Sequence, residues 1–259
     1  MTPSRRLFLS STTILGAGVL VQACRSTQGE SSARAPTSAG GDPPKPDERS
    51  KQADKADASE EVTATEDLMR EHGVLRRALI VYREAADRLR SHGAPVPPEA
   101  LQKTAKLFRS FGEDYHERKL EEAYIFPAVK GAGGSAAIYP DILLAQHDRG
   151  RAITDYVLAA TQGAKIGAGA VALANVLDGF VRMYDSHTAI EDTIVFPAWK
   201  KTLSPKKLDE MGDKFEAIER ETFGKDGFDD AVERIASIEG LLGLSDLSKR
   251  TAPPPPSGV

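Results

Sequence analysis

Four stretches of this chain repeat apolar residues with the three- and four-residue steps of an amphipathic helix, and this periodicity restricts the fold most strongly. They cover about 68–89, 101–127, 140–157 and 173–198. No comparable alternation of polar and apolar residues, as in a half-buried strand, accompanies them. The pattern predicts an all-α protein, an antiparallel four-helix bundle. Further helical stretches at about 205–223 and 229–242 predict extra C-terminal helices that flank the bundle.

Four of the five histidines lie on these apolar stripes, one on each stretch. They are His72, His116, His147 and His187. A single buried histidine is usually a core residue with a satisfied hydrogen bond, but four in one bundle would each need a buried partner. Imidazole is the commonest metal ligand, and bundles build metal sites from inward side chains on facing helices. The fifth, His92, lies beside the helix-ending Gly93 and Pro95 and is expected at the surface or at a helix end.

A glutamate adds to the case for a metal. His187 and Glu191 are four residues apart, so both side chains lie on one face of a helix. Glu191 occupies a core-facing position, where an unpaired carboxylate is costly and a metal ion would remove that cost. A buried His–Glu pair without metal is the alternative, but it leaves the other three histidines unexplained.

The two halves of the helical region repeat one motif. The first half carries Glu71-His72, His116, Glu121-Glu122 and Phe126-Pro127, and the second carries Gln146-His147, His187, Glu191-Asp192 and Phe196-Pro197. Each half therefore supplies two helices and the same ligand order, His and then His plus Glu. Two such hairpins facing each other about a pseudo-two-fold axis could give each of two metal ions two histidines, with both glutamates bridging.

The first half departs from this spacing, because His116 and Glu121 are five residues apart and Leu120 occupies the expected ligand position. On a regular α-helix a five-residue step turns by about 140°, which leaves the face. A π-bulge could return Glu121 to that face, Glu117 could be the ligand instead, or the first half could bind metal poorly. Alignment on the two Phe-Pro pairs favours Glu121 with a bulge.

These motifs are similar to those of the hemerythrin-like His-His-Glu cation-binding family, and the resemblance covers about 65–200. It implies a non-haem site with two Fe ions, bridged by carboxylates and by an oxo or hydroxo group. The implied ligands are His72, His116, Glu121, His147, His187 and Glu191. On affinity alone these donors suit iron, manganese or zinc. The four-histidine, two-glutamate set is closest to that of the repair-of-iron-centres proteins.

The resemblance leaves several functions open. The leading hypothesis is a protein that binds or senses O2 or NO, because the ligand count leaves about one open position per iron. The oxygen-carrying hemerythrins, however, use a fifth histidine and an aspartate for which this chain has no evident equivalent. The alternatives are an enzyme that reduces peroxide or NO, an iron-handling or iron-centre repair protein, and a structural bundle with zinc or no metal. Whether the chain is an enzyme stays open, since no Ser–His–Asp or Cys–His nucleophile set is evident.

The N-terminus resembles a twin-arginine signal peptide followed by a lipobox. Arg5-Arg6 precedes an apolar stretch that ends at Cys24, although Gln22 is an unusual lipobox residue. An uncleaved membrane anchor or a Sec signal is the alternative. The motif predicts export to the cell envelope, with membrane attachment through a lipid on Cys24.

Composition sets the remaining limits. A single cysteine excludes an internal disulfide and a cysteine-based zinc site, and a net charge of −4 gives no reason to expect nucleic acid as a partner. The sequence does not indicate an oligomeric state. The predicted organisation is a signal peptide (1–24), a disordered linker (25–62), the bundle (63–202), a C-terminal helical extension (203–245) and a disordered tail (246–259).

Overall fold

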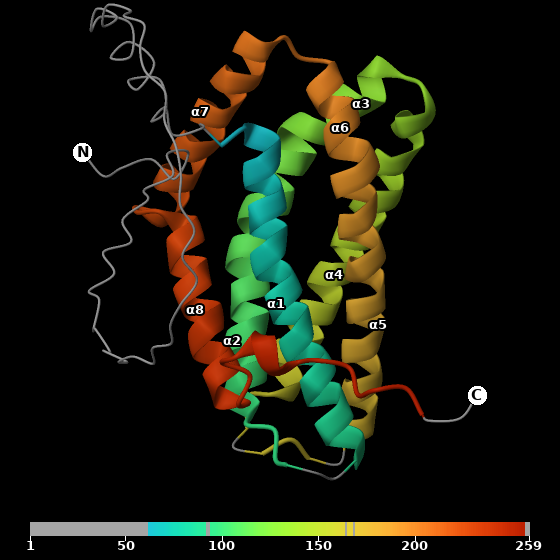
Figure 1. Cartoon of the computed structure of the whole chain (residues 1–259), viewed down its shortest axis with the longest axis vertical. Helices are drawn as coiled ribbons and strands as arrows, with labels where there is room; N and C mark the ends of the chain where they lie inside the picture. The colour runs from blue at the N-terminus through green and yellow to red at the C-terminus, as the bar shows by residue number, and fades with distance from the viewer. Residues whose placement is uncertain (1–61, 92–93, 164, 168, 257–259) are drawn as a thin grey trace, which may run out of the picture. The chain divides into compact units, whose positions relative to one another are not determined.

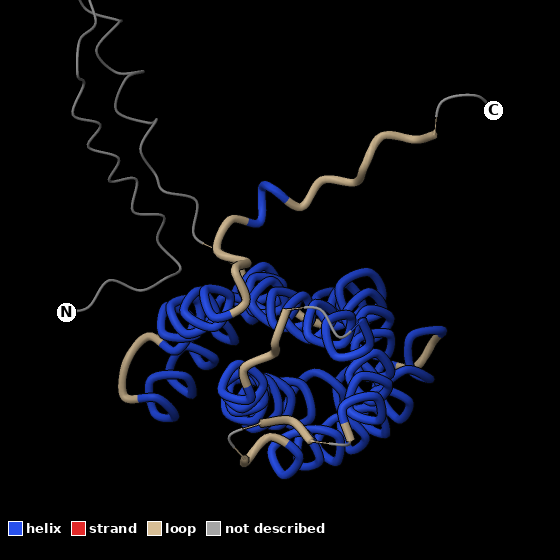
Figure 2. The backbone as a smooth tube through the Cα atoms, turned by 90° about the horizontal axis from the view of Figure 1, so that it is seen from below, coloured by secondary structure: helices blue, strands red, loops and turns tan. Residues whose placement is uncertain are grey.

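The computed structural model describes residues 62–91, 94–163, 165–167 and 169–256. The predicted signal peptide with Cys24, almost all of the predicted linker, and His92 lie outside the described residues. Within the described residues the regular structure is helical, without a strand (Figure 2), which confirms the all-α prediction. None of the helices in these ranges combines the length and the apolar character that crossing a membrane requires.

Four helical rods form the bundle (Figure 1). The first rod is α1 (Ala64–Ser91), and the third is α4 (Tyr139–Ala160), which follows the short 3-10 helix η2 (Ser135–Ile138). The second rod runs without interruption through α2 (Pro98–Leu107), η1 (Phe108–Ile125) and α3 (Phe126–Ala132). The fourth runs through α5 (Ala170–Ile190), η3 (Glu191–Val195) and α6 (Phe196–Lys201). Successive rods alternate in direction, α1 lies along α5, and η1 lies along α4, so the antiparallel four-helix bundle is confirmed.

Local sequence explains where the rods begin and end. Pro98 and Pro140 stand in the first turn of α2 and α4, where a proline costs no backbone hydrogen bond. The second rod ends at Gly133 and Gly134, whose φ angles of 73° and 75° lie in the region that favours glycine. These two residues end α3 and turn the chain into η2, which leads to the third rod.

An aromatic cluster fills the core beside the histidines. The ring of Tyr82 on α1 stacks on Phe108 of η1, with centroids 5.5 Å apart. Phe108 in turn meets Phe180 of α5 edge to face at 4.8 Å, and Phe180 contacts Tyr184 at 4.5 Å. Such pairs add to the burial of apolar area, so this cluster fixes three of the four rods against one another.

The C-terminal extension forms two helices, α7 (Pro205–Phe223) and α8 (Gly227–Leu241), as the sequence predicts. Both pack against the first two rods, α7 on α1 and η1, and α8 on α1 and α2. A bidentate ion pair between Arg77 and the buried Glu239, at 2.8 and 2.7 Å, fastens α8 to α1. Part of the region expected to be a tail forms a 3-10 turn, η4 (Leu247–Lys249).

Candidate metal centre

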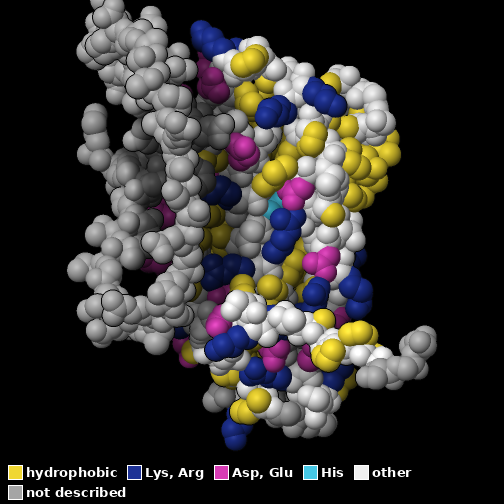
Figure 3. Space-filling view, viewed as in Figure 1, with side chains coloured by type: hydrophobic (Ala, Val, Ile, Leu, Met, Phe, Trp, Pro, Cys, Tyr) yellow, Lys and Arg dark blue, Asp and Glu magenta, His cyan; other side chains and the backbone are white. Residues whose placement is uncertain are grey.

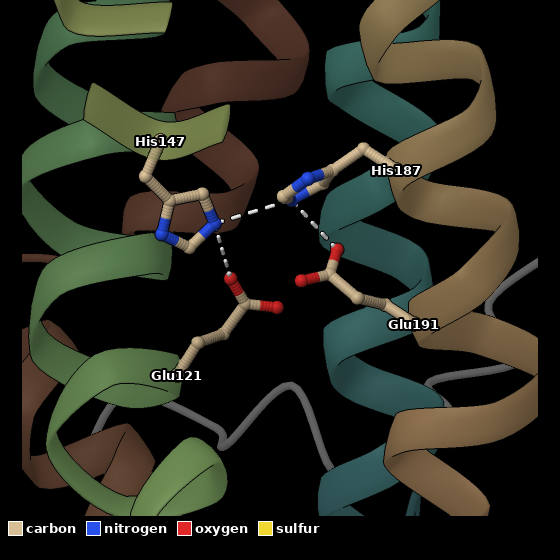
Figure 4. Close-up of side chains that lie close together, drawn as sticks. All are labelled: Glu121, His147, His187 and Glu191. Atoms are coloured by element: carbon tan, nitrogen blue, oxygen red, sulfur yellow. Dashed lines mark hydrogen bonds and ion pairs between the residues drawn. The ribbon is translucent and has the colours of Figure 1, made fainter. Parts of the chain in front are cut away.

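The six residues singled out by sequence meet inside the bundle. His72 lies on α1, His116 and Glu121 on η1, His147 on α4, His187 near the end of α5, and Glu191 at the start of η3. Each is at most 2% exposed. Figure 4 shows four of them, Glu121, His147, His187 and Glu191, pointing toward one another from facing helices. On the face shown in Figure 3, the described histidines are visible as a small spot.

The histidines form two pairs, and each glutamate lies between the pairs. The Nε2 atoms of His72 and His116 are 3.0 Å apart, and those of His147 and His187 are 3.1 Å apart. Glu121 Oε1 is 3.2 Å from Nε2 of His116, and its Oε2 is 3.4 Å from Nε2 of His147. Glu191 Oε2 is 3.1 Å from Nε2 of His187 and 3.5 Å from Nε2 of His72. The donors are thus arranged as two neighbouring groups that share two carboxylates.

A π-helix accounts for the irregular spacing in the first half. η1 is π-helical along its whole length, so a five-residue step returns to the same face and Glu121 joins His116 in the pocket. The predicted bulge is confirmed, and it is far longer than a single turn. The second half contains a shorter π-helix, η3, which begins at Glu191 itself. Sequence reasoning missed η3, because the four-residue step from His187 to Glu191 is that of an ordinary α-helix.

The alternative ligand Glu117 is buried but faces elsewhere. Its Oε1 accepts a hydrogen bond from the Tyr184 hydroxyl at 2.6 Å. Its Oε2 lies 3.2 Å from Arg151 and 3.9 Å from Nδ1 of His147, on the outer side of that ring. Glu121, by contrast, lies between the two histidine pairs. The geometry therefore favours Glu121 over Glu117 as the metal ligand of the first half.

Each histidine also hydrogen-bonds through its outer nitrogen, Nδ1. The acceptors are Glu71 for His116 (2.5 Å), Asp192 for His72 (2.7 Å), Glu122 for His147 (2.9 Å) and Gln146 for His187 (2.9 Å). An acceptor at Nδ1 holds the proton there, so the Nε2 lone pair points into the pocket, as in metal-ligating histidines. Sequence reasoning did not assign these four residues a role, although each is the direct neighbour of a proposed ligand in the repeated motif.

Two features of the pocket fit a metal and are hard to explain without one. Within the described part of the chain, both carboxylate oxygens of Glu121 and both of Glu191 are buried without a hydrogen bond. With protons held on Nδ1, the Nε2 lone pairs of each histidine pair face each other at about the distance of a hydrogen bond. Buried unpaired carboxylates and opposed lone pairs are both costly. Cations between the pairs would remove both costs, so the donor set fits a metal centre.

Protons can take the place of cations in the metal-free pocket. Burial lowers the pKa of His147, but the carboxylates of Glu117, Glu121 and Glu122 outweigh this effect and raise the pKa to about 10. Burial, together with the neighbouring charge of Glu121, holds the pKa of Glu191 well above its usual value. We therefore expect metal binding to displace protons, and to weaken as the pH falls.

The Phe-Pro pairs of the repeat cover the site crosswise. The ring of Phe126, from the first half, stacks on His147 of the second half with centroids 5.4 Å apart. Phe196, from the second half, stacks on His72 of the first half at 5.3 Å. The rings shield the imidazoles from solvent, and each half thereby completes the pocket of the other.

Fold and site together define a helical-bundle metal protein, and comparison with known proteins identifies its family. The model of the hemerythrin HHE cation binding domain matches residues 63–199, and the chain belongs to this family. Three uncharacterized mycobacterial proteins, one from Mycobacterium bovis and two from strains of Mycobacterium tuberculosis, are 44% identical to the chain over 192 residues. The alignments cover 73% of this chain and 74% of each relative. No solved structure matches the chain significantly. Metal binding, as predicted from the motifs, is what the family implies.

Proposed function

We propose that this protein is an exported diiron protein that binds or senses O2 or NO in the cell envelope. The observation that carries the proposal is a buried pocket in which Glu121 and Glu191 each lie between two pairs of histidines. Each pair supplies two imidazole nitrogens, and each glutamate supplies a carboxylate that can reach both pairs. This donor set suits two divalent ions that share two bridging carboxylates.

Iron is the metal that we assign to both positions. Imidazole and carboxylate together suit iron, manganese or zinc on affinity grounds. The carboxylate-bridged dinuclear arrangement and the family membership favour iron among these. When bound, two irons would supply a redox-active centre at which a small ligand can bind.

The burial of the site supports a diatomic ligand over an organic substrate. Every proposed metal ligand is at most 2% exposed, and Phe126 and Phe196 cover two of the imidazoles. The aromatic ring of Tyr184 lies 5.2 Å from that of His187 and closes the pocket toward the core. A ligand that enters without large rearrangement must therefore be small, and O2 and NO meet this condition.

One observation favours a second candidate function, an enzyme that reduces peroxide or NO. Such reductions consume protons, and Glu117 is a buried carboxylate beside His147 that shares a hydrogen bond with Tyr184. A second buried carboxylate, that of Glu113, accepts a hydrogen bond from the hydroxyl of Thr154 on α4 at 2.5 Å. Steady-state consumption of peroxide or NO by the iron-loaded protein would identify an enzyme. Transfer of iron to a metal-free acceptor protein would instead identify an iron-handling or repair protein.

The proposed location rests on the N-terminal sequence. Arg5-Arg6 and the apolar stretch before Cys24 support export by the twin-arginine route and attachment through a lipid on Cys24. Replacing both arginines with lysine should retain the precursor in the cytoplasm. Cys24→Ala should move the exported protein from the membrane fraction to the soluble fraction, and unchanged fractionation would contradict lipid attachment.

The proposed function is tested by metal analysis and optical spectroscopy of protein purified without oxygen. We expect about two irons per chain, from the two donor groups. We also expect a near-ultraviolet spectrum that changes when O2 or NO is admitted. Glu121→Ala should lower the iron content, whereas the matched variant Glu117→Ala should leave it nearly unchanged. One zinc per chain and no iron would contradict the proposal.

A further inference from the structure

The acceptors on the outer side of the histidines differ in charge between the two pairs. In the His72–His116 pair both acceptors are carboxylates, Asp192 and Glu71. In the His147–His187 pair one acceptor is the carboxylate of Glu122 and the other is the amide oxygen of Gln146. A carboxylate acceptor makes an imidazole a stronger electron donor than a neutral amide does. His116 is therefore a stronger donor than its counterpart His187.

Glu71 is also held more firmly than Gln146. Its side chain is 1% exposed, and its Oε1 accepts a hydrogen bond from the Tyr115 hydroxyl at 3.0 Å. Tyr115 immediately precedes His116, and the residue that precedes His187 is the exposed Ser186, whose hydroxyl donates to the Arg182 carbonyl instead. Among the described residues, the second half therefore has no tyrosine that supports Gln146 in the way that Tyr115 supports Glu71.

The C-terminal extension completes this support. The ring of Phe223, at the end of α7, meets the ring of Tyr115 edge to face at 5.2 Å. Phe111 contacts both rings, at 5.7 Å from Tyr115 and 6.2 Å from Phe223. Residues 205–241, which form α7 and α8, lie beyond the range 63–199 that matches the family. Helix α7, which lies outside the family domain, thus contacts the tyrosine that donates a hydrogen bond to Glu71.

The other charges near the pairs do not cancel this difference. Glu117 adds a negative charge 3.9 Å from Nδ1 of His147, but Arg151 pairs with both Glu117 and Glu122. The Arg151 side chain is only 12% exposed. In the first pair, Arg76 plays the matching role toward Asp192 but is 43% exposed. Its charge is therefore screened more strongly by water than that of Arg151.

We propose that the C-terminal helix α7, acting through Phe223, Tyr115 and Glu71, holds His116 in place, so that the His72–His116 position retains its metal ion longer than the His147–His187 position. This inference rests on the proposed dinuclear centre. Tyr115 and Phe223 are positioning residues: Tyr115 acts on His116 through Glu71, and Phe223 acts through its contact with Tyr115. The physical reason is that a fixed, charged outer partner restricts the imidazole to the orientation that binds metal.

The test measures iron release from the full, iron(II)-loaded chain into excess bipyridine without oxygen. We expect two kinetic phases, one for each position. Tyr115→Phe removes one hydroxyl and should speed the slow phase several-fold, less than the roughly 10- to 100-fold effect of losing a direct outer partner. The fast phase should not change. Phe223→Leu should move the slow phase in the same direction by a smaller factor.

Two matched controls separate positioning from general destabilisation. Tyr82→Phe removes the hydroxyl of another fully buried tyrosine, one without a hydrogen-bond partner among the described residues, and should leave both phases unchanged. Phe215→Leu alters a ring on the same helix as Phe223, but this ring stacks on Trp199 and not on Tyr115. It should therefore leave the ratio of the two release rates unchanged.

The outcomes distinguish this inference from the proposed function. A single release phase for two bound irons would overturn the inference and leave the dinuclear centre standing. An equal response to Tyr115→Phe and Tyr82→Phe would do the same. Failure of the unaltered chain to hold two irons would overturn the proposed function, and this inference with it.

Discussion

The two halves of the metal centre hold equivalent donors in equivalent places, but the residues around these donors differ. At the position three residues before the second histidine, the first half has Glu113 and the second half has Tyr184. One residue after that histidine, Glu117 in the first half corresponds to Thr188. Both carboxylates are buried, so the first half encloses two acidic groups that the second half lacks.

The contacts around the two histidine pairs match in one respect and differ in another. The crosswise partners agree, because Arg76 pairs with Asp192 and Arg151 pairs with Glu122. The outer acceptors of the second histidines do not agree, since Glu71 corresponds to Gln146. The duplicated motif therefore sets the geometry of the donors, and we expect single substitutions around it to set how strongly each position binds. Two ions in such a centre should not be equivalent.

Two single variants, each of which removes one histidine from a different half, should give the largest effect. His187→Ala should leave about one iron per chain, and His116→Ala should leave less, because the firmer position is then destroyed. Both variants should lower the thermal midpoint of the iron-loaded protein. Metal analysis and thermal unfolding measure the two effects. His92→Ala should change neither, since His92 is outside the predicted apolar stripes, and equal iron loss from the two halves would argue for equivalent positions.

Exchange of the residues that accept hydrogen bonds from Nδ1 of His116 and His187 should give the second-largest effect. Glu71→Gln should weaken binding at the first position by about 10- to 100-fold, because His116 loses its charged partner. Gln146→Glu should strengthen binding at the second position by placing a carboxylate on His187. Titration with iron(II) against a competing chelator measures both affinities. The comparison fails if the two exchanges shift the affinities in the same direction.

Replacement of Gly150 on α4 should give a smaller effect, a change in the free energy of unfolding. A Cβ at Gly150 would lie 2.4 Å from the Tyr184 hydroxyl, whereas the matching residue of the first half is Leu75. Gly150→Ala should displace Tyr184 from Glu117 and destabilise the fold by about 1–3 kcal/mol, the usual cost of overpacking. Urea denaturation of the metal-free protein measures this. Gly179→Ala on α5, where nothing lies within 4 Å of the added Cβ, should instead stabilise by about 0.5–1 kcal/mol.

Glu113, one of the two buried acidic residues present only in the first half, should make stability depend on pH. Burial raises the pKa of Glu113 to about 7, despite the opposing hydrogen bond from Thr154. A carboxyl whose pKa is raised on folding stabilises the fold fully at low pH and loses this contribution as the pH rises toward the folded pKa. Stability of the metal-free protein should therefore fall between about pH 4.5 and 7 through this group, and Glu113→Gln should flatten that fall. Asp114→Asn, at a more exposed neighbour, is the matched control and should keep the slope.

Much of the fold and of the candidate site followed from the sequence. The apolar periodicity predicted the four rods and both C-terminal helices, and the six proposed donors meet in one pocket. The outer acceptors could not be assigned in the same way. Asp192 and His72 are 120 residues apart, and their contact depends on how two hairpins face each other. Nor does the spacing of Phe196-Pro197 show that this ring covers a histidine of the other half.

The sequence by itself determined which residues face the core, because side-chain direction along a helix follows from its period. It also determined that the motif occurs twice. Only the tertiary structure placed Glu121, and not Glu117, between the two histidine pairs, since α- and π-helical turns place different residues on one face and the sequence left both open. It alone decided that Glu71 is supported by Tyr115 and Gln146 is not, because this support comes from rings packed across separate helices.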